Sequence, residues 1–442
     1  MKKTAARGHT RKSVERSSRL TAPPKAQSKS LNRGLSAAKA AKQDEFYTQY
    51  VDIQKEVEAY LELDPDTFRG KVVYCNCDDP FESNFFKYFA ANFNKLGLKK
   101  LVTTSYDGSP IAGQLTLFPE YNEGNGKRQK PKALAVILDY VKDEDGDGAA
   151  NVTDVKLFLK RNKAARIALK ADDQYGGGDF RSAPCIALLK EVDIVVTNPP
   201  FSLFREYVAQ LVEHGKKFLI IGNQNAITYK EIFPLIKENK LWLGKGFKRN
   251  CAHFLSPFEA YSKWIEMTRE DFEKQGIKVP EGLHVMRVAG VVWFTNLDHG
   301  RRHQELPLMT MGDNLRFSKH KEIKGKAAYD RYDNYDAIEV PFTDAVPSDY
   351  DGVMGVPITF LDKYNPDQFE ILGMCENKDL YGLKTRVYPG SECKNAYLKK
   401  FGKKGTYDLN ASGVVIRNGL YEKVYQRLLI RNRNRAAGGI KK

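Results

Sequence analysis

DIVVTNPPFSLFREYVAQLVEH, residues 193–214, joins a short apolar run to a stretch of helical length through the tetrapeptide NPPF. Residues 193–197 are mostly apolar on both faces, which is typical of a strand buried inside a parallel sheet. The two prolines remove backbone donors and fix an extended turn, and the amphipathic stretch 201–214 predicts a helix after it. A strand, a turn and a helix in this order indicate one unit of an alternating α/β fold.

The same alternation continues on both sides of this unit. Because several of the apolar runs could be buried on both faces, we expect a mostly parallel sheet with helices on each side. In such a sheet, ligands bind beyond the carboxyl ends of the strands. The other predicted strands are 71–75, 101–104, 218–222, 241–244 and 290–294, and a further helix is predicted at 229–239.

Composition and pattern divide the chain into four parts. We expect an α/β domain over residues 44–300 and, where the alternation fades, a C-terminal domain over 301–430 with more irregular and antiparallel structure. An excursion between the second and third strands, about 108–170, is predicted to be an insertion with its own structure. Residues 1–43 and 431–442 are predicted to be basic tails.

The charge of the chain points to a polyanionic partner. Its 442 residues contain 71 Lys and Arg against 55 Asp and Glu, a net charge of +16, which favours nucleic acid. Residues 1–43 alone hold twelve basic residues and one acid, Glu15. So charged a segment cannot bury enough apolar surface to fold, so we expect disorder, with a role in solubility, in tethering to phosphates or, alternatively, in organelle targeting.

Several protein classes are excluded by simple patterns. No run approaches the roughly 20 apolar residues of a membrane span, and the first residues lack the apolar segment of a signal peptide. We therefore expect a cytoplasmic protein with no membrane partner. The six cysteines form no CxxC pair, so reduced thiols are favoured over a zinc site or disulfides.

The NPPF tetrapeptide is the strongest functional signal. An amino nitrogen conjugated to an aromatic ring is a poor nucleophile because its lone pair is delocalised. The Asn198 amide oxygen and the Pro199 carbonyl could each accept one hydrogen of such an amine and direct the lone pair at an electrophile. Pro200 fixes the turn and Phe201 could stack on the ring. The alternative is a tight strand-to-helix turn in which Asn198 caps the helix.

The sequence here resembles the EcoRI-type adenine-specific DNA methyltransferases, which transfer a methyl group from S-adenosylmethionine to an exocyclic amine. The similarity covers roughly residues 44–300 well and the remainder loosely. It implies a Rossmann-like methyltransferase fold with target recognition at the C-terminus. Four segments carry it: DEFYTQY (44–50), VVYCNCDDPFESNFFKYF (72–89), GDFRSAPCIALLKEVDIVVTNPPFSLFREYV (178–208) and GVVWFTNL (290–297).

The resemblance implies roles for residues on the donor side of the site. Asp179 and Phe180 resemble the acidic and aromatic pair that contacts the adenine of S-adenosylmethionine. The segment Phe46, Tyr47 and Thr48 resembles the motif that closes over its methionine end. Asp179 could instead be a helix N-cap.

The loop after the first strand departs from the family pattern because it contains no glycine. Its residues are Cys75, Asn76, Cys77, Asp78, Asp79 and Pro80. Their side-chain oxygens could contact the donor's ammonium or ribose.

The acid that binds the ribose hydroxyls is expected after the second predicted strand, and Asp107 is the nearest candidate for it.

On the substrate side, the resemblance implies a target adenine flipped out of duplex DNA. Phe294 lies where related enzymes place an aromatic residue near the flipped base, although it could equally be core. Basic residues after 300 could hold the DNA backbone, although each could also be an ordinary solvated charge. These candidates are Arg301, Arg302, Lys384 and Arg386. A cognate restriction endonuclease is a possible partner.

One acidic pattern remains outside this interpretation. Asp143, Asp145, Asp147, Gly148 and Asp154 follow the spacing of a calcium loop, but the twelfth position is Asp rather than Glu. An acidic turn is favoured, and we expect no metal.

Two other functions remain open. The NPPF geometry also suits methylation of RNA or of a protein glutamine. A catalytically inactive nucleic-acid-binding protein is favoured by the basic tails and by the missing loop glycines. Donor binding would separate that alternative from an enzyme, and the large C-terminal part argues against a glutamine substrate.

Overall fold

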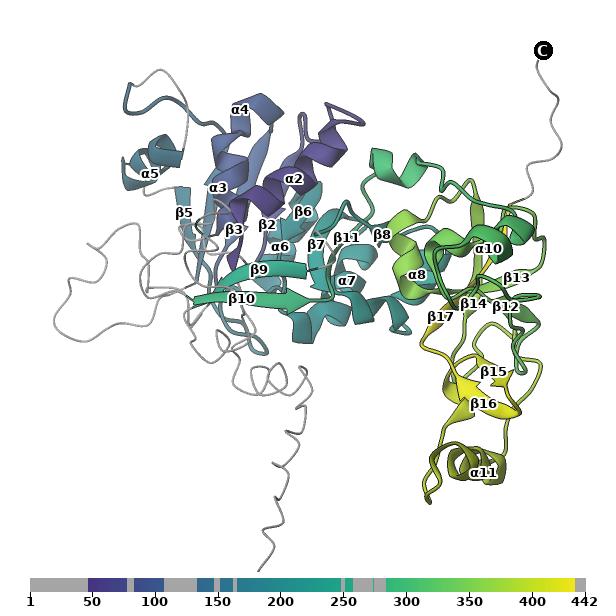
Figure 1. Ribbon diagram of the computed structural model, residues 1–442. Coiled ribbons are helices and arrows are strands. Elements are labelled where there is room, and N and C mark those ends of the chain that lie inside the picture. The colour runs from purple at the N-terminus through teal and green to yellow at the C-terminus, as the bar shows by residue number, and fades with distance from the viewer. Residues whose placement is uncertain are drawn as a thin grey trace, which may run out of the picture.

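A computed structural model describes residues 47–77, 83–106, 133–146, 152–161, 165–247, 251–256, 273 and 284–433. Its centre is an eight-stranded sheet with the strand order β5-β4-β3-β2-β6-β7-β11-β8 (Figure 1). The strands are β2 (Val72–Cys75), β3 (Lys100–Thr104), β4 (Leu134–Leu138), β5 (Arg166–Ala168), β6 (Ile194–Thr197), β7 (Lys217–Asn223), β8 (Trp242–Leu243) and β11 (Val291–Thr295).

The middle of this sheet is parallel. β3, β2, β6 and β7 pair in parallel, with Val73 opposite both Leu101 and Ile194. β4 and β5 extend one side in antiparallel pairing, and β11 pairs antiparallel with both β7 and β8 on the other. The carboxyl ends of β2, β3 and β6 therefore meet at one edge.

Helices cover both faces of the sheet (Figure 1). Because successive strand residues point to opposite faces, Val73 lies in a core with Phe85 of α3, and Tyr74 lies in another with Tyr207 of α7. The first face carries α2 (Tyr50–Leu61), α3 (Asn84–Ala91), α4 (Phe93–Leu96) and α5 (Val152–Arg161), and the second carries α6 (Ala183–Glu191), α7 (Phe204–Glu213) and α8 (Phe233–Lys237).

The predicted insertion at 108–170 does not have a structure of its own over its described residues. Its apolar run forms β4, which pairs with β3, and residues 166–168 form β5, which pairs with β4. Ala135, Val136 and Leu138 of β4 are fully buried. The helix predicted at 229–239 is also shorter: α8 has Pro234 in its first turn, ends at Lys237 and is followed by Asn239 in a left-handed conformation, and a 3-10 helix, η4 (Gln224–Thr228), precedes the predicted range.

A small sheet lies beside the main one. β1 (Tyr47–Thr48) pairs antiparallel with β9 (Cys251–Ser256), which also pairs with β10 (His284–Ala289). Tyr47 lies opposite Leu255 and Thr48 opposite Phe254. A pairing across some 200 residues of chain gives no local signal, and the sequence did not predict these strands.

The C-terminal region, residues 300–433, is built on a four-stranded sheet of order β12-β13-β17-β14. As expected, most of its pairings are antiparallel, although β12 and β13 run parallel. A hairpin and α11 project from this sheet (Figure 1). The elements are α10 (Met311–Phe317), β12 (Ala337–Glu339), β13 (Val353–Pro357), β14 (Phe369–Met374), α11 (Gly390–Phe401), β15 (Val414–Arg417), β16 (Leu420–Lys423) and β17 (Arg427–Asn432), with 3-10 helices η7 (Gly300–His303), η8 (Thr343–Ala345), η9 (Ile358–Lys363) and η10 (Leu409–Ala411).

The two regions share one apolar core. The cluster under α7 and α8 continues without interruption into Ile338, Val356 and Ile430 of the C-terminal sheet. The ring of Phe233 in α8 lies 5.6 Å from the ring of Tyr381. The C-terminal region is thus packed directly against one face of the main sheet.

Candidate active site

Hydrogen bonds tie the carboxyl ends of three parallel strands together. Thr197, the last residue of β6, donates its hydroxyl to the Asn76 carbonyl after β2. Thr104, the last residue of β3, donates its hydroxyl to the Asn76 amide oxygen over 2.9 Å. Asn76 is 1% exposed, so it fixes this edge of the sheet from within.

The loop after β2 makes its turn without glycine. Cys77 has a φ of 63°, the left-handed conformation that glycine usually supplies. The Asn76 amide oxygen accepts from the Cys77 backbone N–H over 2.8 Å, which stabilises that turn locally. Cys75 is fully buried at the end of β2. Asp78, Asp79 and Pro80 lie outside the described residues.

A required glycine brings the Asp179 segment to the end of β3. Gly178 has a φ of 78°, and a side chain there would overlap the carbonyl oxygen of Ser105. This close approach places Asp179 beside β3 and near the edge that Asn76 organises. Asp107, predicted further along the same loop, lies outside the described residues.

Asp179 is not a helix cap. Its carboxylate accepts from Arg181, with Nε 3.0 Å from one oxygen and Nη2 2.8 Å from the other. The start of α6 is instead stabilised by Asp172, whose carboxylate accepts from the Ala183 backbone N–H over 2.8 Å. This bond, followed by those from the Gln174 and Tyr175 backbone N–H groups, lowers the pKa of Asp172.

Phe180 faces the core rather than the solvent. It is 3% exposed, and its ring meets that of Tyr207 edge to face at 4.9 Å. The Arg181 guanidinium lies 5.3 Å from the centre of the same ring. Phe180 therefore anchors the segment, and Asp179 and Arg181 lie at its surface.

The N-terminal motif lies beside the loop after β2. Thr48 is 3% exposed, and its carbonyl accepts from the Asn84 side chain, at the start of α3, over 2.7 Å. Its hydroxyl is buried and has no hydrogen-bond partner among the described residues. Tyr47 belongs to the same short strand, and Phe46 lies outside the described residues.

The NPPF segment leaves β6 at this edge. Pro199 is buried and Asn198 is half-buried. The Pro200 carbonyl accepts from the Leu203 backbone N–H over 3.0 Å, which starts the 3-10 turn η3 (Phe201–Leu203). No side-chain cap from Asn198 is formed at η3 or at α7. The side chain of Asn198 is thus not used as the helix cap that the alternative required.

The comparisons with known proteins decide the family. The sequence model of "Adenine-specific methyltransferase EcoRI" matches residues 34–433. The chain is 44% identical to "Type II methyltransferase M.EcoRI" of Escherichia coli, over 77% of this chain and 89% of that protein. It is 36% identical to "Type II methyltransferase M.MpnI" of Mycoplasma pneumoniae, over 79% and 89%.

The chain belongs to the EcoRI family of adenine-specific methyltransferases. It is therefore an adenine-specific DNA methyltransferase, as its resemblance to this family implied. No solved structure matches the chain. Among the described residues of the enzyme, no helix is both long and apolar enough to cross a membrane.

Phe294 of this methyltransferase lies in the core. It is fully buried in β11, and its ring lies 5.0 Å from that of Phe204 in α7. A side chain at Gly222 of the neighbouring strand β7 would clash with both rings. The structure thus favours the core alternative for Phe294 over contact with a flipped base.

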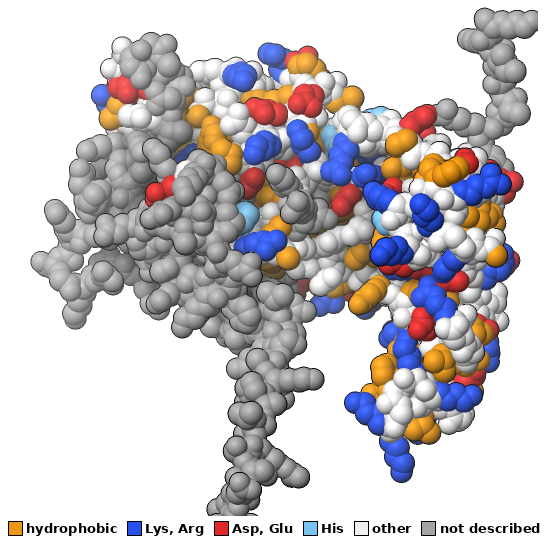
Figure 2. Space-filling model, viewed as in Figure 1, with side chains coloured by type: hydrophobic (Ala, Val, Ile, Leu, Met, Phe, Trp, Pro, Cys, Tyr) orange, Lys and Arg blue, Asp and Glu red, His pale blue; other side chains and the backbone are white. Residues whose placement is uncertain are grey.

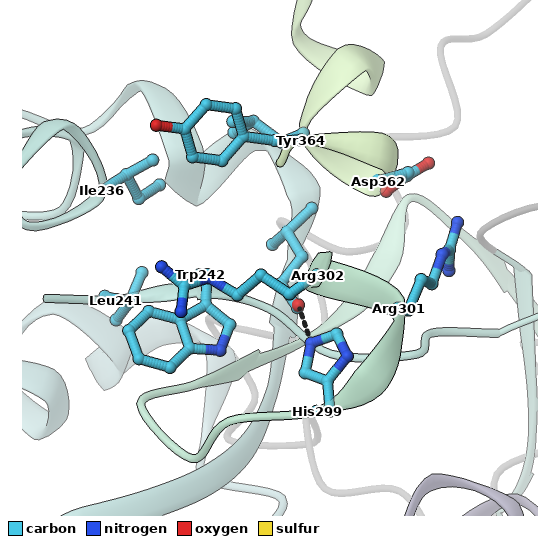
Figure 3. Close-up of a pocket in the computed structure, with 10 residues that line it drawn as sticks. Ile236, Leu241, Trp242, His299, Arg301, Arg302, Asp362 and Tyr364 are labelled. Carbon is cyan, nitrogen blue, oxygen red and sulfur yellow. Dashed lines mark hydrogen bonds between the residues drawn. The ribbon is translucent and has the colours of Figure 1, made fainter. Parts of the chain in front are cut away.

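Arg301 and Arg302 both donate hydrogen bonds within the protein. Arg302 is 8% exposed, lies 3.7 Å from the centre of the Trp242 ring and donates to the Asn239 side chain (Figure 3). Arg301 donates to the Lys245 carbonyl. Both residues line a pocket between β8 and η9, and their hydrogen bonds join η7 to the segment around β8.

Lys384 and Arg386 also make internal contacts. The Lys384 ammonium donates to the carbonyls of Asn377 and Asn410, over 2.8 and 2.9 Å. Arg386 pairs with Asp333 at 2.5 Å and with Glu392 at 2.7 Å. These bonds hold loops of the C-terminal region together, so both cations have partners within the protein.

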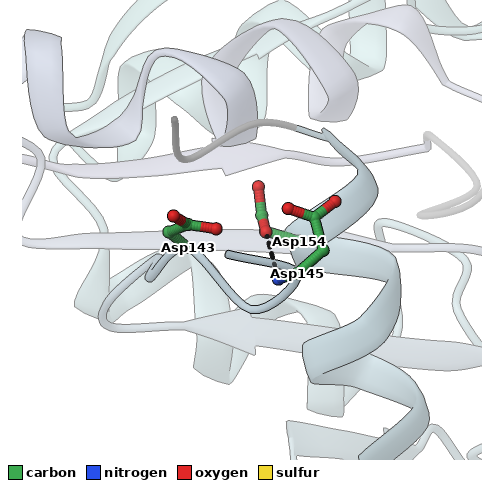
Figure 4. Close-up of side chains that lie close together, drawn as sticks. All are labelled: Asp143, Asp145 and Asp154. Atoms are coloured by element: carbon green, nitrogen blue, oxygen red, sulfur yellow. Dashed lines mark hydrogen bonds between the residues drawn. The ribbon is translucent and has the colours of Figure 1, made fainter. Parts of the chain in front are cut away.

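The acidic turn gathers three of the predicted calcium ligands. Carboxylate oxygens of Asp143, Asp145 and Asp154 lie within 4.8 Å of one another (Figure 4). Asp154 is fully buried, and its carboxylate accepts from the backbone N–H groups of Glu144 and Asp145. The cluster therefore closes a turn onto α5, and Asp147 lies outside the described residues.

Sequence reasoning missed the residues that support the site. Thr104 and Asn84 touch predicted site residues, but each contact joins parts of the chain that only folding brings together. Arg181 touches Asp179, two positions away. Arg181 was the most accessible to prediction, because a basic residue two positions after an acid can pair with it in a turn.

Proposed function

We propose that the enzyme transfers the methyl group of S-adenosylmethionine to N6 of an adenine flipped out of duplex DNA at a specific site. The observation that carries this proposal is the position of Asn198 and Pro199, at the end of β6 and beside the linked ends of β2 and β3. The parallel strands at the centre of the sheet agree with a Rossmann-like methyltransferase fold, whose ligands bind at this edge.

The described residues fit S-adenosylmethionine. Asp179 offers carboxylate oxygens at the surface of the edge, and the buried hydroxyl of Thr48 has no partner among the described residues. We propose that Asp179 accepts from the donor's adenine amino group and that Thr48 binds near its methionine end. When bound, S-adenosylmethionine supplies an electrophilic methyl group.

The protein's part in the reaction is to hold the target amine. The Asn198 amide oxygen and the Pro199 carbonyl each accept one amine hydrogen, which directs the nitrogen lone pair outward. Pro200 cannot donate a backbone N–H in competition. Phe201, which packs on the core under α2 and α3, would stack on the adenine and hold its plane.

Neutral acceptors suit this task. An aromatic amine does not need to lose a proton before it attacks: the nitrogen–carbon bond would form as the methyl–sulfur bond of the donor breaks, the sulfur would keep the electron pair as a neutral thioether, and the proton would then pass to water. Among the described residues, Asn76, Thr104 and Thr197 bring amide, hydroxyl and carbonyl groups to the linked ends of β2, β3 and β6. The mechanism therefore rests on position and on hydrogen bonding rather than on a charged base.

The C-terminal region is the proposed target-recognition part. We assign residues 44–300 to catalysis and 301–430 to recognition, with basic tails at both ends. A base inside a duplex must be flipped out before it can be methylated, and a second region that grips the DNA backbone would support that step. The type II names of the relatives suggest a cognate restriction endonuclease and a cytoplasmic location.

Expression in a bacterial host that lacks adenine methylation tests the proposal. Modification-sensitive sequencing of the host DNA should then show N6-methyladenine at one short sequence motif. Purified enzyme should methylate a duplex containing that motif and leave an RNA of the same sequence unmodified. DNA without methylated adenine, or RNA modified in preference to DNA, would contradict the proposal.

A further inference from the structure

A projection of the C-terminal region carries an unusual surplus of lysine. This projection, here called the arm, consists of residues 376–426 and contains α11, β15 and β16 (Figure 1). Figure 2 shows Lys and Arg side chains gathered at its far end. Exposed lysines there lie on α11 and in the turn that follows it: Lys394, Lys399, Lys403 and Lys404.

The inner face of α11 is firmly held. Cys393 and Ala396 are buried in a small core with Leu409 and Val414. The ring of Phe401 lies 4.6 Å from that of Tyr397, and Gly402 ends the helix in a left-handed conformation. The helix therefore presents its outer face as a rigid surface.

The acids of the arm are all used inside it. Glu392 accepts from Arg386 and from the Tyr421 hydroxyl, and Glu422 pairs with Arg417 and Lys400. The other three acids, Glu376, Asp379 and Asp408, accept from backbone N–H groups of neighbouring loops.

The four lysines, in contrast, make no ion pair with any described residue. Folding thus pairs two of the five acids with basic residues of the arm and ties the other three to backbone N–H groups, while the four lysines stay exposed. A cluster of exposed ammonium groups that make no ion pair with a described residue repels itself and attracts a polyanion.

We propose that α11 and the turn after it bind the phosphate backbone of duplex DNA, with Lys399, Lys403 and Lys404 as the main contacts. The inference rests on the proposed function, because it takes the substrate duplex as the polyanion. Lysine is a compact point charge without the planar fork of arginine, so these contacts position the duplex and do not read its bases.

Salt dependence of DNA binding measures this contact directly. Replacing Lys399, Lys403 and Lys404 by Gln in the full-length protein should lower the slope of log Kd against log salt by about 3, since each lost phosphate contact removes about 0.9. These side chains lie outside the buried core of α11, so the melting temperature should not change.

A matched control variant carries the same change in charge at three lysines outside the arm. Lys95, Lys99 and Lys190 are exposed, make no ion pair with a described residue, and lie before the amino ends of β3 and β6. Their replacement by Gln should leave the slope near that of the wild type. S-adenosylmethionine affinity should be the same in both variants.

The outcomes separate this inference from the proposed function. Equal slopes for the arm variant and the control would overturn the arm's role even if the wild type methylates DNA. A loss of affinity confined to the cognate sequence would also overturn it, because that result indicates base reading. A wild type that neither binds nor methylates duplex DNA would instead contradict the proposed function.

Discussion

The carboxyl edge of the main sheet and the C-terminal region use polar side chains in opposite ways. At the edge, neutral groups of Asn76, Thr104 and Thr197 join three strands. In the C-terminal region, charged pairs link strands, as in the ion pair of 2.6 Å between Glu339 of β12 and Arg427 of β17. Neutral hydrogen bonds join the strand ends, with the Asp179–Arg181 ion pair at the surface of the edge, whereas charged pairs help to hold together a region that has less regular sheet structure.

The largest expected effect comes from breaking the buried pair. Glu339 is 2% exposed and also accepts from the Tyr332 hydroxyl. Glu339→Ala should reduce the free energy of unfolding by about 3 to 5 kcal/mol, because it leaves the Arg427 charge buried and unpaired. Denaturant unfolding measures this loss. The exposed pair of Arg331 and Asp336 is the control, and Asp336→Ala should change stability by less than about 1 kcal/mol.

The pH dependence of stability should have opposite signs in the two regions. Burial raises the pKa of Glu56, behind the main sheet, to about 7, despite hydrogen bonds from the Gly246 and Lys245 backbone N–H groups. The contribution of Glu56 to the free energy of unfolding is therefore fully present below pH 4.5. It is lost, by about 3 kcal/mol, as the pH rises through 7. Glu56→Gln should flatten unfolding free energy against pH over this range. An unchanged profile would show that Glu56 does not titrate there.

In the C-terminal region, burial favours a higher pKa for Asp330, but hydrogen bonds from Arg417 and Lys326 outweigh it and lower the pKa. Asp330 therefore stabilises the fold above its unfolded pKa, and this contribution is lost as the pH falls through its folded pKa. Asp330→Asn should reduce the loss of stability in acid. A variant with the acid sensitivity of the wild type would count against this ion-pair account.

The smallest predicted effect separates donor binding from folding. Asp179→Ala should weaken S-adenosylmethionine binding by about 1 to 3 kcal/mol, the scale of a hydrogen bond to a charged group. Asp172→Ala should lower the melting temperature and leave donor affinity nearly unchanged, because Asp172 stabilises the start of α6. Calorimetry and thermal unfolding on both variants measure the two effects. Normal donor affinity in Asp179→Ala would remove Asp179 from the site.

The sequence predicted the centre of the fold well because local patterns determine it. Predicted strands at 71–75, 193–197 and 218–222 agree with β2, β6 and β7 to within a residue or two. The same reasoning wrongly assigned the residues of β4 to a separate insertion, because an apolar run does not show which strand it will pair with. Pairing partner and direction depend on contacts distant in sequence, as between β1 and β9.

The candidate site likewise contains residues whose role the sequence could predict and residues whose role it could not. The NPPF motif could be found because its residues are consecutive and follow a buried strand. The roles of Arg302, Lys384 and Arg386 could not, because a basic residue in a sequence does not reveal whether its partner will be a phosphate or a protein group. In the structure these cations contact Asn239, Asn410 and Asp333.

The rate of methyl transfer by Asn198→Ala tests the central claim most directly. In a single-turnover assay with saturating S-adenosylmethionine and cognate duplex, the account predicts a rate lowered by about a hundredfold or more, the scale of losing one preorganised polar contact. Donor affinity should match the wild type, and Asn198→Asp should retain more activity than the alanine variant because its oxygens can still accept. An alanine variant that keeps most of the wild-type rate would contradict the account.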